Sequence, residues 1–308
     1  MRQHTPFVGL LPAVLTPFDS HGELNLAAVE PHAELLVRDR AAGVFVGGTT
    51  GEFSSLTFEE RLSLAARWAA LVKGTPLKLV VHVGSNCLAD AKQLAAHAQT
   101  LGAAAVATVA PNYVKPKSLD VLIRWCAELA AAAPETPFYF YDIPAMTGVA
   151  FPMVDFLEQA AAQIPTLAGL KFTNLDLMTF QRLLRVGGGR FDVLFGFDEQ
   201  LLAAVVLGAR AAVGSSYNFA APMYNRLLAA ANAGDFATAR AEQYRGAELI
   251  VLMQKYGFLA AAKELMRVRG VDLGSVRLPN APLTGEAAAF RHELAAAGLL
   301  DAIGAVGG

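Results

Sequence analysis

A single lysine, Lys171, stands near the end of the apolar run "TLAGLKF" at residues 166 to 172, where a buried strand would be ending. An ordinary lysine lays its stem along apolar atoms and keeps its ammonium in water. A lysine that points inward at the mouth of a barrel is cut off from water, so burial should disfavour its charged form. The chemistry that needs such a nucleophilic amine is Schiff-base formation with a ketone.

Two neighbouring threonines, Thr49 and Thr50, form a second candidate group in "VGGTTGEFSSLTFEER" at residues 46 to 61. The two glycines before them permit close backbone approach, and the threonines offer main-chain N–H groups and hydroxyls to an anion. A carboxylate fits such a turn. The same segment also predicts a helix start with Thr57 as its N-cap, and both interpretations can hold because they use different residues.

Two more segments carry polar groups just after apolar runs. In "FYFYDIPAMTG", residues 138 to 148, Tyr141 could transfer protons beside an imine, or it could pack as a core aromatic. In "FGFDEQLL", residues 195 to 202, Gly196 precedes Asp198 and Glu199. Acidic residues favour a helix start in any case. At a barrel mouth they would also accept hydrogen bonds from a polyhydroxylated substrate.

Composition excludes several classes of protein. The 308 residues are 54% hydrophobic and 17% charged with a net charge of −2, and the scattered basic residues indicate neither nucleic-acid nor membrane-surface binding. No window reaches the roughly 18 consecutive apolar residues of a membrane helix. Two cysteines provide no disulfide framework, which favours a cytoplasmic protein. The six histidines show no paired ligand spacing, so we expect no metal. No segment matches a phosphate P-loop or a dinucleotide-binding fingerprint, and we expect no cofactor.

Short apolar runs alternate with longer segments of helical period, a pattern typical of βαβ units. Seven helices are expected at residues 25–40, 59–73, 89–101, 118–132, 153–163, 176–186 and 198–207. Eight strands are expected at residues 10–16, 43–48, 77–84, 104–111, 137–144, 167–172, 191–196 and 210–215.

This alternation predicts an α/β fold, a closed (β/α)₈ TIM barrel with a C-terminal helical extension. We expect residues 1–220 to form the barrel that carries the active site, and residues 221–308 to form helices packed on it. Reactive groups in such barrels gather at the carboxyl ends of the strands. Lys171 and Tyr141 both fall there.

Six motifs in register resemble the dihydrodipicolinate synthase and N-acetylneuraminate lyase superfamily over nearly the whole chain. In order they are "GGTTGE", "APNYVKP", "YDIPAMTG", "GLKFTNLDL", "FGFDEQLL" and "GARAAVGSSYN". The last three, with the "FYFYDIPA" run, look most like the N-acetylneuraminate lyases. The resemblance implies a Schiff-base aldolase that needs no cofactor or metal.

The resemblance also implies roles for individual residues. Lys171 would form the Schiff base, Tyr141 would transfer protons, and Thr49 with Thr50 would hold the substrate carboxylate. Tyr113 matches an aromatic that enters a neighbouring subunit's site in many members, which implies a homo-oligomer, usually a tetramer. The subsite for the remaining carbons would be lined by Thr173, Gly196, Asp198, Glu199 and Ser215. The implied catalytic residues are Lys171, Tyr141, Thr50 and Tyr113.

One departure separates the subfamilies. Dihydrodipicolinate synthases carry an arginine five residues after the strand tyrosine, and this chain has Met146 there. A thioether cannot replace a bidentate carboxylate donor, so lysine biosynthesis is disfavoured. The resemblance therefore implies a carbon–carbon lyase that cleaves N-acetylneuraminate reversibly to N-acetylmannosamine and pyruvate. The alternatives are a 2-keto-3-deoxy sugar acid aldolase or dehydratase, and a non-catalytic pyruvate- or sugar-binding sensor.

Overall fold

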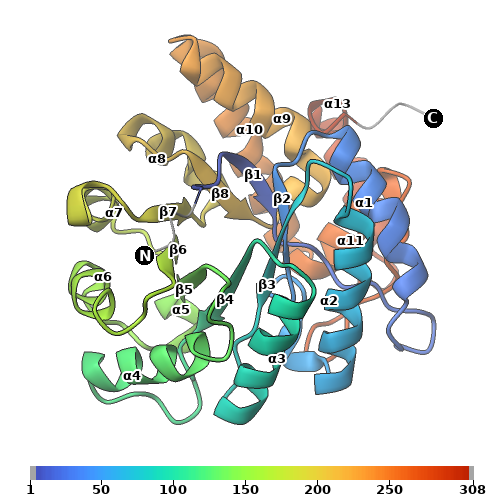
Figure 1. The fold of residues 1–308 in the computed structure, drawn as a ribbon. Coiled ribbons are helices and arrows are strands. Elements are labelled where there is room, and N and C mark those ends of the chain that lie inside the picture. The colour runs from blue at the N-terminus through green and yellow to red at the C-terminus, as the bar shows by residue number, and fades with distance from the viewer. Residues whose placement is uncertain (1–4, 305–308) are drawn as a thin grey trace.

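The computed structural model describes residues 5–304, and its central feature is a ring of eight strands (Figure 1). Each strand is short, rich in apolar residues and buried along nearly its whole length, as parallel strands covered on both faces should be. All eight predicted strands are confirmed. They are β1 (Gly9–Pro12), β2 (Gly43–Val46), β3 (Lys78–His82), β4 (Ala105–Val109), β5 (Phe138–Asp142), β6 (Leu167–Phe172), β7 (Asp192–Phe195) and β8 (Ala211–Gly214).

The strands pair in parallel in the order β1-β8-β7-β6-β5-β4-β3-β2. The two ends of this sheet meet at a bridge between Ala13 and Phe45, where the Val14 N–H donates to the Phe45 carbonyl at 3.1 Å. The sheet is therefore a nearly closed barrel, which confirms the predicted (β/α)₈ fold.

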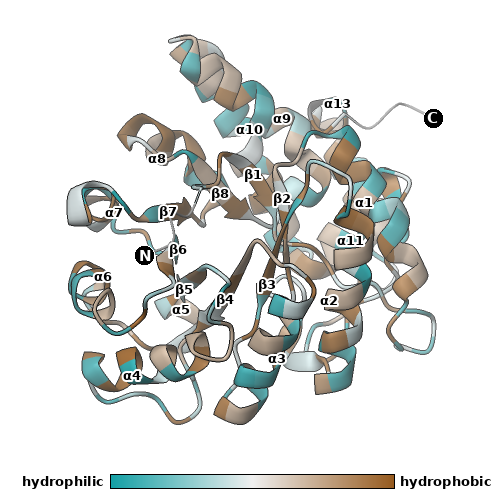
Figure 2. Ribbon diagram, viewed as in Figure 1, coloured by the Kyte–Doolittle hydropathy of each residue, from teal (hydrophilic) through white to brown (hydrophobic). Residues whose placement is uncertain are grey.

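Helices surround the strands; the strands are mainly brown, whereas the helices mix hydrophobic and polar residues (Figure 2). Local sequence sets several of their ends. Thr57 and Glu60 form a capping box at the start of α2, as the sequence predicted for Thr57, and Gly208 in the left-handed region ends α8. The helices are α1 (Val29–Arg38), α2 (Phe58–Val72), α3 (Leu88–Thr100), α4 (Leu119–Ala130), α5 (Pro144–Thr147), α6 (Met153–Ala160), α7 (Leu177–Leu183) and α8 (Leu201–Leu207).

Two apolar clusters divide the core. The smaller fills the barrel interior and includes Leu11, Phe45, Val80, Tyr139 and Tyr141. The larger lies between the strands and the helices. Because successive strand residues point to opposite faces, membership of one cluster or the other shows which way a strand residue points.

The remaining helices are α9 (Tyr217–Asn232), α10 (Phe236–Lys255), α11 (Phe258–Val268), α12 (Ala287–Ala296) and α13 (Leu299–Ala302). The segments "NAGDF" and "KYGF" separate α9 from α10 and α10 from α11. The expected division between residues 220 and 221 falls inside α9, which also contacts β1. Among residues 5–304, no helix is both long and apolar enough to span a bilayer.

Candidate active site

Lys171 points into the barrel from β6. Its strand neighbours Leu170 and Phe172 belong to the cluster between strands and helices, so the residue between them faces the interior. The side chain is buried, with the residue 4% exposed, and β6 ends one residue later. The sequence-based placement of this lysine, inward and at the carboxyl end of the strand, is confirmed.

Aromatic rings surround the lysine amine. Tyr141 on β5 is the register partner of Lys171, and the lysine Nζ lies 3.9 Å from the centroid of its ring. The Phe45 ring from β2 lies 4.4 Å from the same atom. Ring faces are weakly attractive to a cation. Within residues 5–304, no carboxylate forms an ion pair with Lys171.

The threonine turn follows β2 at the same rim. Thr50 is buried, and its Oγ1 lies 2.6 Å from the Oγ of Ser215, which follows β8. In the described part of the chain, the main-chain N–H groups of Thr49, Thr50 and Gly51 donate to no protein acceptor. A turn with free N–H groups and a hydroxyl is suited to bind an anion such as a carboxylate.

Asp198 is a buried carboxylate in the 3₁₀ turn η4 (Asp198–Gln200) after β7. The main-chain N–H and the hydroxyl of Ser216 both donate to its Oδ2, at 2.7 and 2.5 Å. Its Oδ1 has no hydrogen-bond partner, and the Tyr217 phenol lies near without hydrogen-bond geometry. Burial raises the pKa of Asp198, although the Ser216 hydrogen bonds and the charge of Lys171 oppose the shift.

The other predicted subsite residues lie close to Asp198. Glu199 is adjacent, and burial raises the pKa of its carboxyl, with a further contribution from the Asp198 charge. The Thr173 hydroxyl is buried without a partner and packs against Gly196 so closely that a Cβ there would lie 1.9 Å from it. At Gly214 a Cβ would lie 1.6 Å from Asp198 Oδ1. These polar groups therefore gather at one place on the rim.

Two residues lie apart from this group. Tyr113, in the loop after β4, is 89% exposed, and its side chain joins none of the groups described above. Its main-chain N–H donates to Asn86 Oδ1 at 3.2 Å, which fixes the loop but not the ring. Met146, on α5, is also exposed. Within a single chain, the structure does not bring Tyr113 to Lys171.

His82 ends β3, the strand beside β2 and β4. It is buried, and its Nδ1 pairs with the Gly47 carbonyl at 2.8 Å, but its Nε2 has no partner. Burial lowers the pKa of His82 well below its usual value, helped by the charges of Arg61 and Lys171. The imidazole is therefore neutral beside the Tyr141 ring, at a centroid distance of 6.2 Å.

Ser216 was not recognised as a partner of Asp198 from the sequence. The two residues lie 18 positions apart, after β7 and β8, and the parallel pairing of these neighbouring strands brings them together. The serine pair in "VGSSYN" was the available signal, since one serine faces Thr50 and the other faces Asp198.

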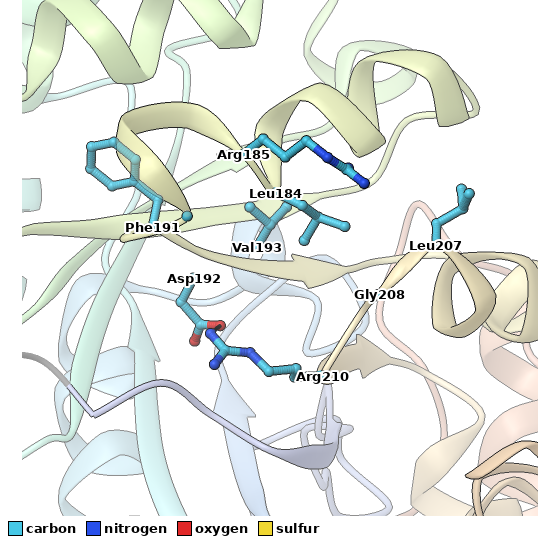
Figure 3. Close-up of a pocket in the computed structure, with 9 residues that line it drawn as sticks. Leu184, Arg185, Phe191, Asp192, Val193, Leu207, Gly208 and Arg210 are labelled. Carbon is cyan, nitrogen blue, oxygen red and sulfur yellow. Dashed lines mark ion pairs between the residues drawn. The ribbon is translucent and has the colours of Figure 1, made fainter.

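A separate pocket of about 330 Å³ lies at the opposite, amino ends of β7 and β8 (Figure 3). The Asp192 carboxylate and the Arg210 guanidinium face each other there at 3.9 Å. The pocket contains none of the predicted site residues. Its lining residues are Leu184, Arg185, Gly189, Phe191, Asp192, Val193, Leu207, Gly208 and Arg210.

No group of three or more His, Cys, Asp and Glu residues that could hold a metal ion occurs between residues 5 and 304. The groups that gather at the rim are instead an amine, a phenol, hydroxyls, main-chain N–H groups and two carboxyls. Such an arrangement can bind an α-keto acid by its carboxylate and present its ketone to the amine.

Comparison with known proteins agrees with this chemistry. The family model for the dihydrodipicolinate synthetase family matches residues 6–297. N-acetylneuraminate lyase A of Xenopus laevis is 41% identical over 88% of this chain and 90% of that protein, and the Homo sapiens N-acetylneuraminate lyase is 39% identical over 88% and 86%.

Solved structures give the same result. The Proteus mirabilis N-acetylneuraminate lyase superposes with a TM-score of 0.93 at 38% identity, covering 96% of this chain and all of that one. The sialic acid aldolase of Aliivibrio salmonicida has a TM-score of 0.93 at 39% identity, covering 96% and 98%. With a family model matched along almost its whole length and relatives near 40% identity, this chain belongs to the dihydrodipicolinate synthetase family.

Proposed function

We propose that this protein is a class I aldolase, a carbon–carbon lyase that cleaves N-acetylneuraminate reversibly to N-acetylmannosamine and pyruvate. The lyase names of relatives near 40% identity support this substrate. The observation that carries the proposal is the buried Lys171 amine, which lies beside the Tyr141 ring with no carboxylate partner among the described residues.

Lys171 begins the reaction by attacking the C2 ketone of the open-chain sugar acid. Loss of water gives a protonated imine, which withdraws electrons from the C3–C4 bond. When the proton leaves the C4 hydroxyl, this bond breaks, an aldehyde is released as N-acetylmannosamine, and the electron pair remains as an enamine. Protonation at C3 and hydrolysis by one water then release pyruvate and restore the amine.

Tyr141 transfers the proton of the C4 hydroxyl. Its ring contacts the lysine amine and its strand register matches that of Lys171, so the phenol and the imine stay on neighbouring strands throughout the reaction. The turn at Thr49 and Thr50 holds the substrate carboxylate through its free N–H groups and the Thr50 hydroxyl. With the acid end fixed, the C2 ketone faces the amine.

The remaining carbons of the sugar occupy the far side of the rim. Thr173 and Asp198 each have a buried oxygen without a hydrogen-bond partner, and sugar hydroxyls satisfy such groups. Glu199 and Ser215 lie beside them and complete the subsite, and Gly196 leaves room where a side chain would clash. Replacing Asp198 with Asn or Glu199 with Gln is expected to impair cleavage of N-acetylneuraminate more than that of shorter keto acids.

We also propose that the protein is a cytoplasmic homotetramer. Tyr113 supports the assembly, because an aromatic side chain exposed this far is typical of an interface residue. The free state of Cys87 and Cys126 supports a reducing compartment. Sedimentation analysis of the wild type and of Tyr113→Ala tests the assembly.

The central test is a mass measurement after incubation with N-acetylneuraminate and sodium borohydride. A reduced pyruvate skeleton on the peptide that contains Lys171 is expected, together with free N-acetylmannosamine. Trapping on another lysine, or no trapping, refutes the assignment. A panel of 2-keto-3-deoxy sugar acids run in parallel identifies the preferred substrate. If the protein cleaves these acids and not N-acetylneuraminate, the proposed substrate is wrong.

A further inference from the structure

Glu52 closes the threonine turn in a conformation that it would not adopt by itself. Its φ is 52° and its ψ is 37°, in the left-handed region that a side chain with a Cβ rarely occupies. The residue is 3% exposed, and its N–H donates to the Thr49 carbonyl at 3.0 Å. Such a conformation persists only where the surroundings impose it.

Residues of the C-terminal extension contact the Glu52 side chain and hold it in place. Lys263, on α11, is 1% exposed, and its Nζ lies 3.4 Å from Glu52 Oε1, an ion pair without hydrogen-bond geometry. Lys263 also donates to the Ser275 carbonyl and lies over the Phe18 ring, 4.3 Å from its centroid. The second carboxylate oxygen of Glu52 accepts from the Arg277 main-chain N–H at 2.9 Å.

Arg277 extends this attachment to both sides of the turn. Its guanidinium pairs with Glu60 at the start of α2, at 2.5 and 2.8 Å, and donates to the Ser55 carbonyl at 3.0 Å. It also donates to the Gly22 carbonyl at 2.7 Å. Within the barrel itself, the turn is also held by Thr16, whose hydroxyl donates to the Gly51 carbonyl at 2.7 Å, and by the contact of Ser215 with Thr50.

Burial lowers the pKa of Lys263 to about 8, against the attraction of Glu52, which raises it. An ammonium buried at this cost stays charged near neutral pH because a carboxylate and a carbonyl both face it. Removing either member would leave the other buried without its charged partner. Glu52 would keep the hydrogen bonds from the Arg277 N–H and the Asn280 side chain, but the turn that carries Thr49 and Thr50 would lose its ionic attachment to α11.

We propose that Lys263 and Glu52 are positioning residues for the carboxylate-binding turn, so that the C-terminal extension sets the geometry of the active site. This inference rests on the proposed function, because it assumes that Thr49 and Thr50 hold the carboxylate of pyruvate. Lys263 touches no substrate. It acts through Glu52 on the N–H groups next to it.

The test compares borohydride trapping of pyruvate with trapping of pyruvamide, which has the same ketone but no carboxylate. Lys263→Met should lower the trapping rate of pyruvate about tenfold or more and that of pyruvamide less than about twofold, since misplaced donors weaken only the carboxylate contact. Glu52→Gln keeps the shape of the side chain and should give a smaller loss of the same kind. The double variant should lose no more than the worse single variant, because the two residues act as one unit.

Lys255→Met is the matched control. It removes another lysine of the extension, one that pairs with Glu293 at 2.7 Å on the exposed surface of α10. It should leave the trapping of both compounds unchanged.

Equal losses for pyruvate and pyruvamide in both single variants would overturn the inference, because the ion pair would then serve folding alone. Unchanged pyruvate trapping in a folded Lys263→Met or Glu52→Gln variant would also overturn it. A wild-type protein that traps neither compound on Lys171 would overturn the proposed function itself.

Discussion

Two lysines of this protein are buried to almost the same extent and differ in what faces the amine. Lys263 has a carboxylate, a carbonyl and an aromatic ring around it. Lys171 has two aromatic rings and, within residues 5–304, no ion-pairing carboxylate. Lys263 lies beside the threonine turn, and Lys171 lies near the end of β6 at the same rim of the barrel.

The difference separates a structural ammonium from a reactive amine. If Lys263 lost its proton, Glu52 would remain as a buried carboxylate without a cation, which is costly. Lys171 forms no ion pair with any carboxylate of the described chain, and its charge acts on the Asp198 carboxyl only without direct contact. Burial alone therefore does not mark a lysine as reactive. The absence of a paired acid beside it is the more informative feature.

Lys171→Ala should have the largest effect on activity. The nucleophile is lost, so kcat for N-acetylneuraminate cleavage should fall by at least about 10⁴-fold, and pyruvate trapping should disappear. A coupled assay for pyruvate measures the first and mass spectrometry the second. Residual activity within tenfold of the wild type would contradict the role of Lys171 as the nucleophile, because some other group would then carry the chemistry.

Tyr141→Phe should have the next largest effect. The ring against the amine is kept and the phenolic proton donor is removed, so kcat should fall about 10² to 10⁴-fold. Imine formation should be retained, since Lys171 is untouched. Steady-state rates and borohydride trapping, measured together, separate the two steps. A parallel loss of trapping would show that the phenol serves the amine and not the C4 hydroxyl.

Lys263→Met and Lys171→Met should differ in their effect on the free energy of unfolding. Breaking the buried pair should destabilise the fold by about 3–5 kcal/mol, because Glu52 is left unpaired. The same change at Lys171 breaks no ion pair, so it should leave the free energy of unfolding unchanged or raise it. Urea denaturation at pH 7 provides both free energies of unfolding. Equal destabilisation by the two substitutions would contradict the distinction.

Asp142→Asn has the smallest expected effect and depends on pH. Burial raises the pKa of Asp142 to about 7, opposed by a hydrogen bond from Asn174 at 3.4 Å. In the unfolded chain the carboxyl loses its proton near pH 4, so the folded state binds the extra proton between about pH 4 and 7. Stability therefore falls as pH rises through this window, and the full penalty remains above pH 7.

The asparagine variant lacks this titration. It should be more stable than the wild type at pH 8 by on the order of 2–4 kcal/mol, and the difference should shrink toward zero as pH falls to 4. Thermal unfolding at several pH values measures it. A constant difference at all pH values would mean that Asp142 does not titrate in this range.

The barrel was predictable because its signals are local. Each strand is a short apolar run ended by turn residues, and Lys171 and Tyr141 follow from their places within such runs. The brief α5 was not predicted, since four residues beginning with Pro144 carry no helical period. The roles of the site residues remain predictions. The role implied for Tyr113, in the site of a neighbouring subunit, requires a second subunit.

The partners of the buried carboxylates near the candidate site could not be predicted from the sequence. Glu52 and Lys263 are 211 positions apart, and the "GGTTGE" motif shows the glutamate without showing its partner. Similarly, nothing next to Asp198 in the sequence indicates that Ser216 will face it. Long-range partners of buried charges depend on how the elements pack, which a pattern along the chain does not record.

Two tightly packed glycines, Gly196 and Gly214, lie beside the proposed sugar subsite and limit how its shape can change. Any side chain at Gly196 would collide with Thr173, and any at Gly214 with Asp198, so a mutant with a narrower site at either position must also move a neighbour. Exposed Met146 carries no such restriction. New specificities should therefore arise in laboratory selections by single substitutions at the outer edge, whereas the inner wall should change only through paired substitutions.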